Sequence, residues 1–287
     1  MIKFIIAARR KPQDTQERYF YEWGIIHVAL MVTSPSVMRT FRRYVQHYSI
    51  PGIDDGMLVH PLSPMAWDNM ADHWMERLED MGEATRAEDY VQRMQPHVFG
   101  DKEFVLQLTS GEVIHEEPGF APGGVKLIHF LDRKSGLSTE EFNRRWRGQH
   151  AEVYLQAIRS GRAPIRKYVQ NPQLEFDRGF FKGTLFEHGG VNRFAGVEEF
   201  WFDSVEELAR LRHDARLHEA ILASEADFVG PADTFSMVTT ERVIYDYTLG
   251  DRSSPLPAVL DPDSLEAAIH RQGLRDWNIP SPARRRS

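Results

Sequence analysis

The sequence predicts an α+β fold in which two tandem ferredoxin-like (βαββαβ) repeats close together into one barrel. The segment KFIIAARRK, which begins at Lys3, aligns with KLIHFLDRK, which begins at Lys126, at an offset of 123 residues. The offset grows along the chain and reaches 130 where Gly100 aligns with Gly230. Offsets that grow in small steps between segments indicate one duplicated unit whose loops later changed length.

Each repeat begins with a short apolar run and a capped helix. In the second copy the run 125–131 is followed by Ser138 and Glu141, which have the spacing of a capping box. In the first copy Asp14 and Glu17 are the equivalent cap. Residues that recur every three or four positions then define one buried helix face. They are Phe142, Trp146, His150 and Val153 in the second copy and Tyr19, Trp23, His27 and Leu30 in the first.

Three further strands and a second helix complete each repeat. In the second copy we expect strands at 165–170, ended by Asn171-Pro172, and at 197–202 and 235–244, with a helix after Ser204. In the first copy we expect them at 42–48, 71–75 and 103–108, with a helix from Arg77. The order strand, helix, strand, strand, helix, strand is the ferredoxin-like unit. We therefore assign residues 1–120 to the first repeat, 125–245 to the second, and 246–287, with a short helix near 264–270, to a C-terminal extension.

A ferredoxin-like sheet carries helices on one face only, so its other face must be covered. The second repeat is the expected cover. Two sheets packed face to face would form a barrel-like sandwich, and an elongated cavity can remain between them. We expect the functional site in that cavity.

Composition narrows the classes of function. The 287 residues, 41% hydrophobic and 27% charged, are those of a globular protein with room for two cores. The sequence contains no run of about 18 apolar residues, the length needed to span a bilayer. The N-terminal residues do not have the order of a secretory signal. We therefore expect a cytoplasmic protein without a membrane partner. The absence of cysteine excludes disulfides and thiolate metal sites, and the net charge of −7 argues against nucleic acid as a partner.

Motifs for bound cofactors are missing as well. The sequence contains no H-E-x-x-H helix, no phosphate-binding glycine loop that opens a helix, and no G-x-S-x-G elbow. His213 and His218 are five residues apart and so lie on different faces of a helix. We therefore expect neither a metal nor another cofactor.

Three separated motifs resemble the EthD domain. Arg-Arg-Lys-Pro, from Arg9, ends the first strand, W-x-x-x-H lies at Trp23 and His27, and R-Y-V-Q-H spans 43–47. The second copy repeats the helix motif at 146–150 and the strand motif at 167–171. The resemblance covers roughly residues 1–245 and implies two EthD copies in one chain. EthD domains belong to the dimeric α+β barrel superfamily, so it also implies that one chain here forms a barrel that usually takes two.

The resemblance further implies an enzyme. Members and relatives of the superfamily include cofactor-independent dehydratases, decarboxylases, cyclases and isomerases of aromatic or polyketide-like compounds, cofactor-free monooxygenases and some haem enzymes. The family therefore indicates the fold more firmly than the reaction.

The catalytic candidates are histidines and tyrosines. His150 and His27 follow the motif tryptophans on a buried helix face, where an imidazole could serve as general acid or base or could simply hydrogen-bond the backbone. His129 interrupts an apolar strand where the first copy has Ile6, an asymmetry expected if one half is specialised. Tyr168 and Tyr44 on the second strands could donate to a substrate oxygen or could only pack.

Other side chains are candidates for substrate binding. The two glutamines share a strand face with the tyrosines, the two histidines have no histidine counterpart in the other repeat, and the tryptophans could form an aromatic slot or belong to the core. They are Gln46, Gln170, His47, His73, Trp23, Trp74, Trp146 and Trp201. The glycine-rich segment 176–196 is either a lid over the cavity or a surface loop that has drifted.

These features favour a cofactor-independent lyase that acts on a small aromatic or polyketide-like compound by histidine-mediated acid/base catalysis. Loss of water, carbon dioxide or formaldehyde would all fit. The alternatives are a cofactor-free monooxygenase of a phenolic substrate and a non-catalytic protein that binds an aromatic compound or haem. The expected partner is the small aromatic substrate, and a homo-oligomer joined through the C-terminal extension stays open.

Overall fold

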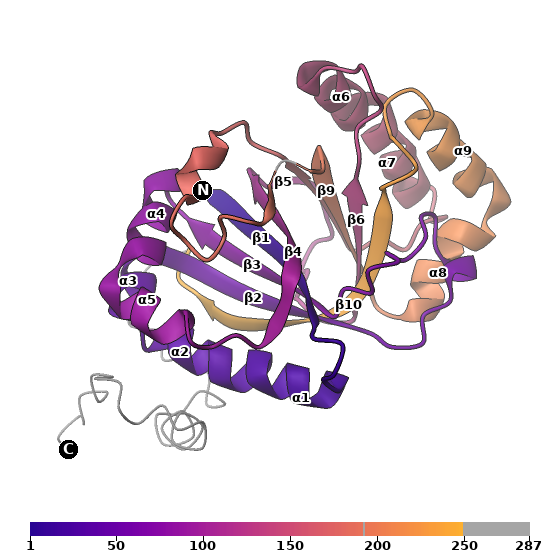
Figure 1. The fold of residues 1–287 in the computed structure, drawn as a ribbon. Helices are drawn as coiled ribbons and strands as arrows, with labels where there is room; N and C mark the ends of the chain where they lie inside the picture. Colours follow the sequence, from indigo (N-terminus) through magenta and orange to yellow (C-terminus); the bar gives the residue numbers. More distant parts are fainter. Residues whose placement is uncertain (192, 249–287) are drawn as a thin grey trace.

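A computed structural model describes residues 1–191 and 193–248, and within them ten strands form one sheet with helices outside it (Figure 1). The strand order is β5-β7-β9-β6-β10-β2-β3-β1-β4-β8. Most of the C-terminal extension, including the helix expected near 264–270, lies outside the described residues. Below, residues 1–120 are called the first half and residues 125–248 the second half.

In the first half, strands flank a long helical segment and a pair of shorter helices. The elements are β1 (Ile2–Arg10), α1 (Gln16–Tyr21), the π-turn η1 (Glu22–His27), α2 (Val28–Val32), α3 (Pro35–Thr40), β2 (Phe41–Ser49), the 3-10 turn η2 (Asp55–Met57), β3 (Asn69–Met75), α4 (Leu78–Arg86), α5 (Glu88–Met94), β4 (Gly100–Thr109) and β5 (Glu112–Glu116). The N-cap of α1 is Thr15, whose hydroxyl accepts from the Arg18 amide, and not the expected Asp14.

The second half repeats this order of main elements. They are β6 (Val125–Leu131), α6 (Thr139–Arg145), the π-turn η3 (Trp146–His150), α7 (Ala151–Arg159), β7 (Lys167–Pro172), the 3-10 turn η4 (Arg178–Phe181), β8 (Gly190–Val191), β9 (Gly196–Phe202), α8 (Val205–His213), α9 (Ala215–Glu225) and β10 (Phe235–Asp246). Ser138 caps α6 as predicted, because its hydroxyl accepts from the Glu141 amide at 3.1 Å.

Some strand limits differ from the predicted ones. The strand expected at 165–170 is β7, which begins two residues later and continues through Pro172. A proline cannot donate to the ladder, but its carbonyl still accepts, and here it accepts from the Ser110 amide at 3.4 Å. The strands β5 and β8 were not predicted.

The last strand of each half crosses into the other half. Residues 235–239 of β10 pair with β6 of the same half, whereas residues 239–246 pair with β2 of the first half. Likewise β4 pairs with β1 of the same half. The next strand, β5, follows after a two-residue connection and pairs with β7 of the second half. The expected pair of separate sheets packed face to face is therefore wrong in detail, because these shared strands join both halves into one continuous sheet.

Connections also cross between the halves. The β2–β3 connection of the first half buries Leu58 in the core of the second half, beside Tyr154 and Phe200. The β7–β9 connection of the second half buries Phe181 in the core of the first half, beside Phe4. Each half therefore helps to cover the space between the sheet and the helices of the other.

The helices lie on the outside, with α1 to α5 around the first half and α6 to α9 around the second (Figure 1). Thr109, at the end of β4, forms a bridge with Gln173, next to β7, and this contact closes the sheet into a barrel. Residues alternate along each strand between the barrel interior and the space beneath these helices. Over the residues that the structure covers, none of the helices is both long and apolar enough to cross a membrane.

Candidate active site

A cavity of about 210 Å³ lies between the sheet and the helices of the first half. Its walls are mainly apolar and include Phe4, Ile6, Trp23, Phe99, Phe104 and Phe186. The cavity was expected between two sheets, on the opposite face of the strands. Small residues leave room here, since Ala8 and Ala71 line the cavity.

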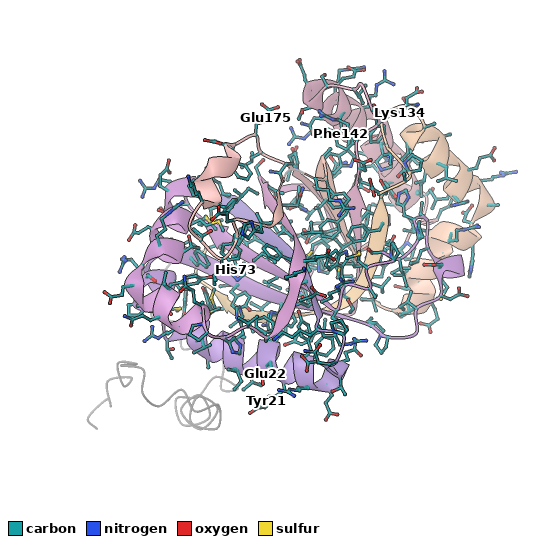
Figure 2. All side chains as sticks on the ribbon, viewed as in Figure 1. Tyr21, Glu22, His73, Lys134, Phe142 and Glu175 are labelled. Atoms are coloured by element: carbon teal, nitrogen blue, oxygen red, sulfur yellow. The ribbon has the colours of Figure 1, made fainter. Side chains whose placement is uncertain are left out.

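Three imidazoles line this cavity: His27, His73 and His97. His73 lies on β3 of the first half (Figure 2) and stacks on Tyr44 with 4.4 Å between ring centroids. Among the described residues, neither ring nitrogen of His73 has a hydrogen bond of standard geometry, and the same holds for His27 Nδ1 and His97 Nε2. Buried polar atoms of this kind are uncommon and are available to a ligand.

Burial keeps these imidazoles neutral. It lowers the pKa of His73 to about 4, although Asp72 and the Phe4 backbone oppose the shift. Burial likewise lowers the pKa of His97 to about 4. The pKa of His27 falls well below its usual value through burial and the neighbouring His97 and His73. At neutral pH each ring therefore offers one N–H donor and one nitrogen acceptor.

Replacement of His73 by Phe should remove part of the acid sensitivity of the protein. Because the folded pKa is about 4 and the ordinary value is 6.5, the contribution of neutral His73 is complete above pH 6.5. It is lost as the pH falls through the folded value, a difference of about 3 kcal/mol at most. Phenylalanine keeps the stacking on Tyr44, as Phe200 does on Tyr168.

Urea unfolding as a function of pH tests this expectation. The free energy of unfolding of His73→Phe should fall less steeply between pH 6.5 and about pH 4 than that of the unsubstituted protein. Identical slopes would mean that His73 takes up its proton in the folded protein at the same pH as in the unfolded chain. His213→Phe, at an exposed histidine on α8, is the matched control.

The second half contributes to this cavity. Leu185 and Phe186, from the connection between β7 and β9, lie in its wall. Phe181 of the same connection is buried beside Phe4, and Arg86 donates to the Phe180 carbonyl. Most of the glycine-rich segment 176–196 is thus placed against the first half, where it covers the cavity.

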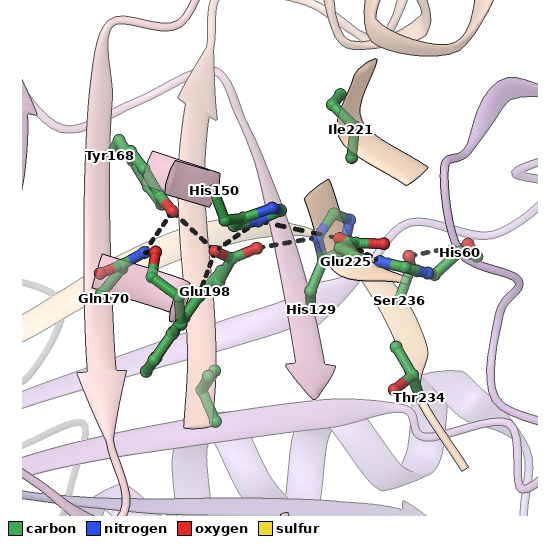
Figure 3. Close-up of polar contacts among 12 residues, drawn as sticks. His60, His129, His150, Tyr168, Gln170, Glu198, Ile221, Glu225, Thr234 and Ser236 are labelled. Carbon is green, nitrogen blue, oxygen red and sulfur yellow. Dashed lines mark hydrogen bonds and ion pairs between the residues drawn. The ribbon is translucent and has the colours of Figure 1, made fainter. Parts of the chain in front are cut away.

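The space beneath the helices of the second half holds a carboxylate, Glu198, among polar side chains (Figure 3). Trp146 Nε1 donates to Glu198 Oε1 at 2.5 Å, and the Tyr168 hydroxyl donates to the same oxygen at 2.6 Å. His150 Nε2 lies 3.2 Å from Oε1, and His129 Nδ1 lies 3.4 Å from Oε2. One buried carboxylate therefore gathers four side chains from β6, η3 and β7.

A second carboxylate extends this cluster. Glu225 Oε1 of α9 lies 3.1 Å from His60 Nε2 and 3.7 Å from His150 Nε2. His150 Nδ1 lies 2.7 Å from the Ser224 hydroxyl. His60 belongs to the first half and reaches the cluster through the crossing β2–β3 connection.

Burial and the neighbouring charges act against each other in this cluster. Burial alone would lower the pKa of His150, but Glu198 and Glu225 outweigh it and raise that pKa. Burial also opposes ionisation of Glu198, yet His150 and His129 hold its pKa well below the usual value. Burial lowers the pKa of His129. His150 and Glu198 thus form a buried ion pair.

The barrel interior contains a third polar cluster. Lys3 Nζ lies 2.8 Å from Asp72 and 2.6 Å from Glu199, and Lys126 Nζ lies 2.6 Å from Glu199. His47 Nε2 lies 3.1 Å from Asp72. In the described chain, the ligand atoms of His47, Asp72 and Glu199 lie within 4.8 Å of one another, close enough for a metal ion. The two buried ammonium groups already supply the positive charge that these carboxylates need.

The predicted site residues are therefore divided among different places. His27, His73 and Trp23 line the cavity, and Tyr44 and Gln46 lie next to it on β2. The second-half cluster contains His150, His129, Tyr168, Trp146 and Gln170. The barrel interior contains His47, which lies beside Asp72, and also Trp74 and Trp201, whose rings pack on the buried lysines.

Glu198, Glu225, His60 and His97 were not predicted as site residues. Glu198 had a signal, because a Glu-Glu pair interrupts the apolar strand Gly196–Phe202 and its counterpart in the first half is Ala71. Glu225, His60 and His97 had none, since they lie on a polar helix end or in connections whose position depends on the fold.

Comparison with known proteins supports an EthD domain. The sequence pattern of the EthD domain matches residues 134–232, which lie in the second half. A chalcone isomerase, cfoK, from Aspergillus candidus is 20% identical over 207 residues, which cover 70% of this chain and 80% of that protein. The chain is thus an α+β protein in which residues 134–232 match the EthD domain, and 70% of its length is similar to a protein named as an enzyme.

Similar folds occur among solved structures. A mutant chlorite dismutase from Candidatus Nitrospira defluvii has a TM-score of 0.45 and 11% identity, with 93% of this chain and 94% of that chain covered. A haem-binding protein from Thermus thermophilus has a TM-score of 0.42 and 8% identity, with 84% and 90% covered. Likeness at this level carries no argument about function.

Proposed function

We propose that this protein is a cofactor-independent lyase or isomerase of a small aromatic compound and that its active site is the first-half cavity. The observation that carries the proposal is the set of three neutral imidazoles with unpartnered nitrogens in a largely apolar cavity. The volume of about 210 Å³ is below the range of roughly 300–1,000 Å³ usual for drug-sized ligands, which favours a compact, flat compound.

Such a cavity suits proton transfer. A histidine can take a proton from a phenol or from a carbon next to a carbonyl and return it elsewhere, so that a carbon–oxygen bond closes or opens. If the substrate is an aromatic ketone, its carbonyl group accepts the electron pair that the lost proton leaves behind, so the reaction requires no redox group. His27 and His73 are the proposed acid/base residues, and Trp23 is the proposed contact to the ring. Aromatic walls exclude water and strengthen these polar contacts.

The relative in Aspergillus candidus supports the choice of substrate class. Its name assigns it to chalcones, which are aromatic enones, and the proposed chemistry is of the kind that isomerises such a compound. For the present chain we extend this to loss of water or another small group from a small aromatic or polyketide-like compound.

We also propose that the first half is a second EthD copy. Both halves have the same order of main elements, and Trp23 and His27 on η1 correspond to Trp146 and His150 on η3. In the first half β2 pairs with β3, and in the second half β7 pairs with β9 in the equivalent register. One chain would then supply both units of the barrel.

A panel of hydroxylated chalcones and hydroxyaryl ketones, followed by absorbance, tests the proposed activity. We expect turnover without added metal or cofactor, and a fall in kcat of about 10²–10⁴ in His27→Gln. His73→Gln should fall comparably, whereas His213→Gln, at an exposed site on α8, should keep full activity.

Oxygen uptake is recorded in the same assay. Turnover that consumes oxygen would assign the protein to the monooxygenases and contradict the lyase proposal. Turnover that survives loss of both cavity histidines would remove the first-half cavity as the active site.

A further inference from the structure

The two halves carry the same tryptophan, tyrosine, histidine and glutamine beneath their helices. Only the second half places a carboxylate, that of Glu198, among these side chains. Gln46 on β2 is paired with Ala71 on β3, and Gln170 on β7 is paired with Glu198 on β9. Glu198 therefore occupies the same place in the second half that Ala71 occupies in the first. Ala71 lines the cavity, so this place is open there.

The supporting hydrogen bonds are repeated in both halves. Gln46 Nε2 donates to the Trp23 carbonyl at 3.1 Å and to the Tyr44 hydroxyl at 2.8 Å. Gln170 Nε2 donates to the Trp146 carbonyl at 3.1 Å and to the Tyr168 hydroxyl at 2.6 Å. The glutamine thus fixes tryptophan and tyrosine in the same way on both sides, which leaves each tyrosine its own proton to donate.

Only the second half uses these donors within the protein. There Trp146 Nε1 and the Tyr168 hydroxyl donate to Glu198 Oε1, and His150 Nε2 lies 3.2 Å from the same oxygen. Figure 3 shows Tyr168 and His150 directed toward Glu198. In the first half neither Trp23 Nε1 nor the Tyr44 hydroxyl donates to a described residue, and the hydroxyl only accepts, from Gln46. Both side chains are almost fully buried, and Trp23 lines the cavity. Buried donors without acceptors point to a ligand oxygen at this place.

We propose that the first-half cavity binds the phenolic oxygen of an aromatic ligand where Glu198 Oε1 lies in the second half. Trp23 Nε1, the Tyr44 hydroxyl and His27 then hold that oxygen, as their counterparts hold the carboxylate. This inference rests on the proposed function, since it names the substrate class of the same cavity.

The donor set selects one oxygen and not two. Glu198 Oε2 faces His129 at 3.4 Å, but the counterpart of His129 is Ile6, which is apolar and lines the cavity. In both halves this residue is paired with the Glu198 or Ala71 position. A carboxylate ligand would have its second oxygen against Ile6 without a donor, which costs free energy. A phenol has a single oxygen on an apolar ring and fits both features.

Proton transfer to His27 completes the arrangement. The phenol O–H bond breaks and an N–H bond forms on the imidazole, so that a phenolate faces an imidazolium. The same pair of charges already exists in the second half, between Glu198 and His150. The phenolate is then the nucleophile, or the leaving group, of the proposed reaction.

Binding of 4-nitrophenol, measured by calorimetry and by the visible band of its phenolate, tests the inference without any turnover. We expect 4-nitrophenol to bind at least about 10-fold more tightly than 4-nitroanisole, which has no phenolic proton, and than 4-nitrobenzoate. Equal affinity for the phenol and its methyl ether would overturn the phenol site. Tighter binding of the benzoate would overturn the single-oxygen selection.

Variants locate the binding. Trp23→Phe should weaken 4-nitrophenol binding about 10-fold, as expected for loss of one hydrogen bond to a charged oxygen. Ala71→Glu should abolish it, because the new carboxylate would take the same donors. Trp67→Phe is the control, since Trp67 also has an unpartnered indole N–H but does not line the cavity.

Unchanged binding in both Trp23→Phe and Ala71→Glu would overturn the inference. The unfolding curve of each variant shows whether it has folded, and Trp23→Phe remains informative if Ala71→Glu has not. Failure of this inference is distinguishable from failure of the proposed function, because turnover of the ketone panel could persist with no preference for a phenol.

Discussion

Lys126→Met should lower the free energy of unfolding by about 3–5 kcal/mol, since it removes one partner of a buried ion cluster. Lys126 is 2% exposed and its ammonium lies 2.6 Å from Glu199, which is 1% exposed. Lys3 would remain to balance both Asp72 and Glu199, so one buried negative charge would lose its partner. Methionine preserves most of the side-chain volume, so the loss is mainly electrostatic.

Urea unfolding at pH 7 measures this effect. The carboxyls of Asp72 and Glu199 are both ionised at this pH. The buried ammonium groups outweigh the effect of burial, so the pKa of Asp72 lies well below its usual value and the pKa of Glu199 also lies below its usual value. Lys102→Met, at an exposed position of β4, should change stability by no more than about 0.5 kcal/mol.

A double variant separates charge from packing. Lys126→Met with Glu199→Gln removes one charge of each sign, so it should recover much of the stability lost in Lys126→Met alone. If the double variant loses the sum of the two single effects, the cluster contributes through packing and the electrostatic explanation is wrong.

The cluster explains how the two halves stay in register. Lys3 and Asp72 belong to the first half and Lys126 and Glu199 to the second, and Lys3 joins carboxylates of both. A one-residue slip of a strand would move each of these charged side chains to the other face of the sheet, away from its partner. Ion pairs that meet only in one alignment favour that alignment.

The course of the main strands could be predicted because it follows from local signals. Apolar runs, the cap at Ser138 and the repeated motif at Trp23 and Trp146 are all properties of short segments. The crossing of β5 into the second half could not be predicted, because Glu112–Glu116 has no strong strand pattern and is fixed only by its partner β7. Its pairing depends on the whole barrel.

The sequence predicted some residues of the cavity wall but not the position of the cavity. His27, His73 and Trp23 were expected in a site and do line one cavity. The face of the sheet was misjudged, since the barrel interior was expected to be open and is occupied by buried lysines and carboxylates. The duplicated sequence hides this difference, because Lys3 and Lys126 read as ordinary strand ends until their partners are known.

Glu198→Ala should be the other strongly destabilising change, with an expected loss of about 3–5 kcal/mol. The carboxylate is fully buried and faces Trp146, Tyr168, His150 and His129. Its removal leaves these groups without their acceptor and also leaves a cavity. Glu198→Gln keeps the volume and one acceptor oxygen, so it should cost less. Glu219→Ala, at an exposed position of α9, is the control.

The pH dependence of this loss identifies its cause. Glu198 and Glu225 raise the pKa of His150 above 6.5 against the effect of burial. The contribution of protonated His150 is therefore complete below pH 6.5 and is lost as the pH rises through the raised folded value. The gap in stability between the unsubstituted protein and Glu198→Gln should accordingly be larger at about pH 6 than at about pH 9.

Urea unfolding at both pH values measures this gap. A gap that does not change with pH would show that Glu198 acts only as a neutral acceptor. In that case its carboxylate would not stand for an anionic ligand, and the parallel with a phenolate beside His27 would lose its support.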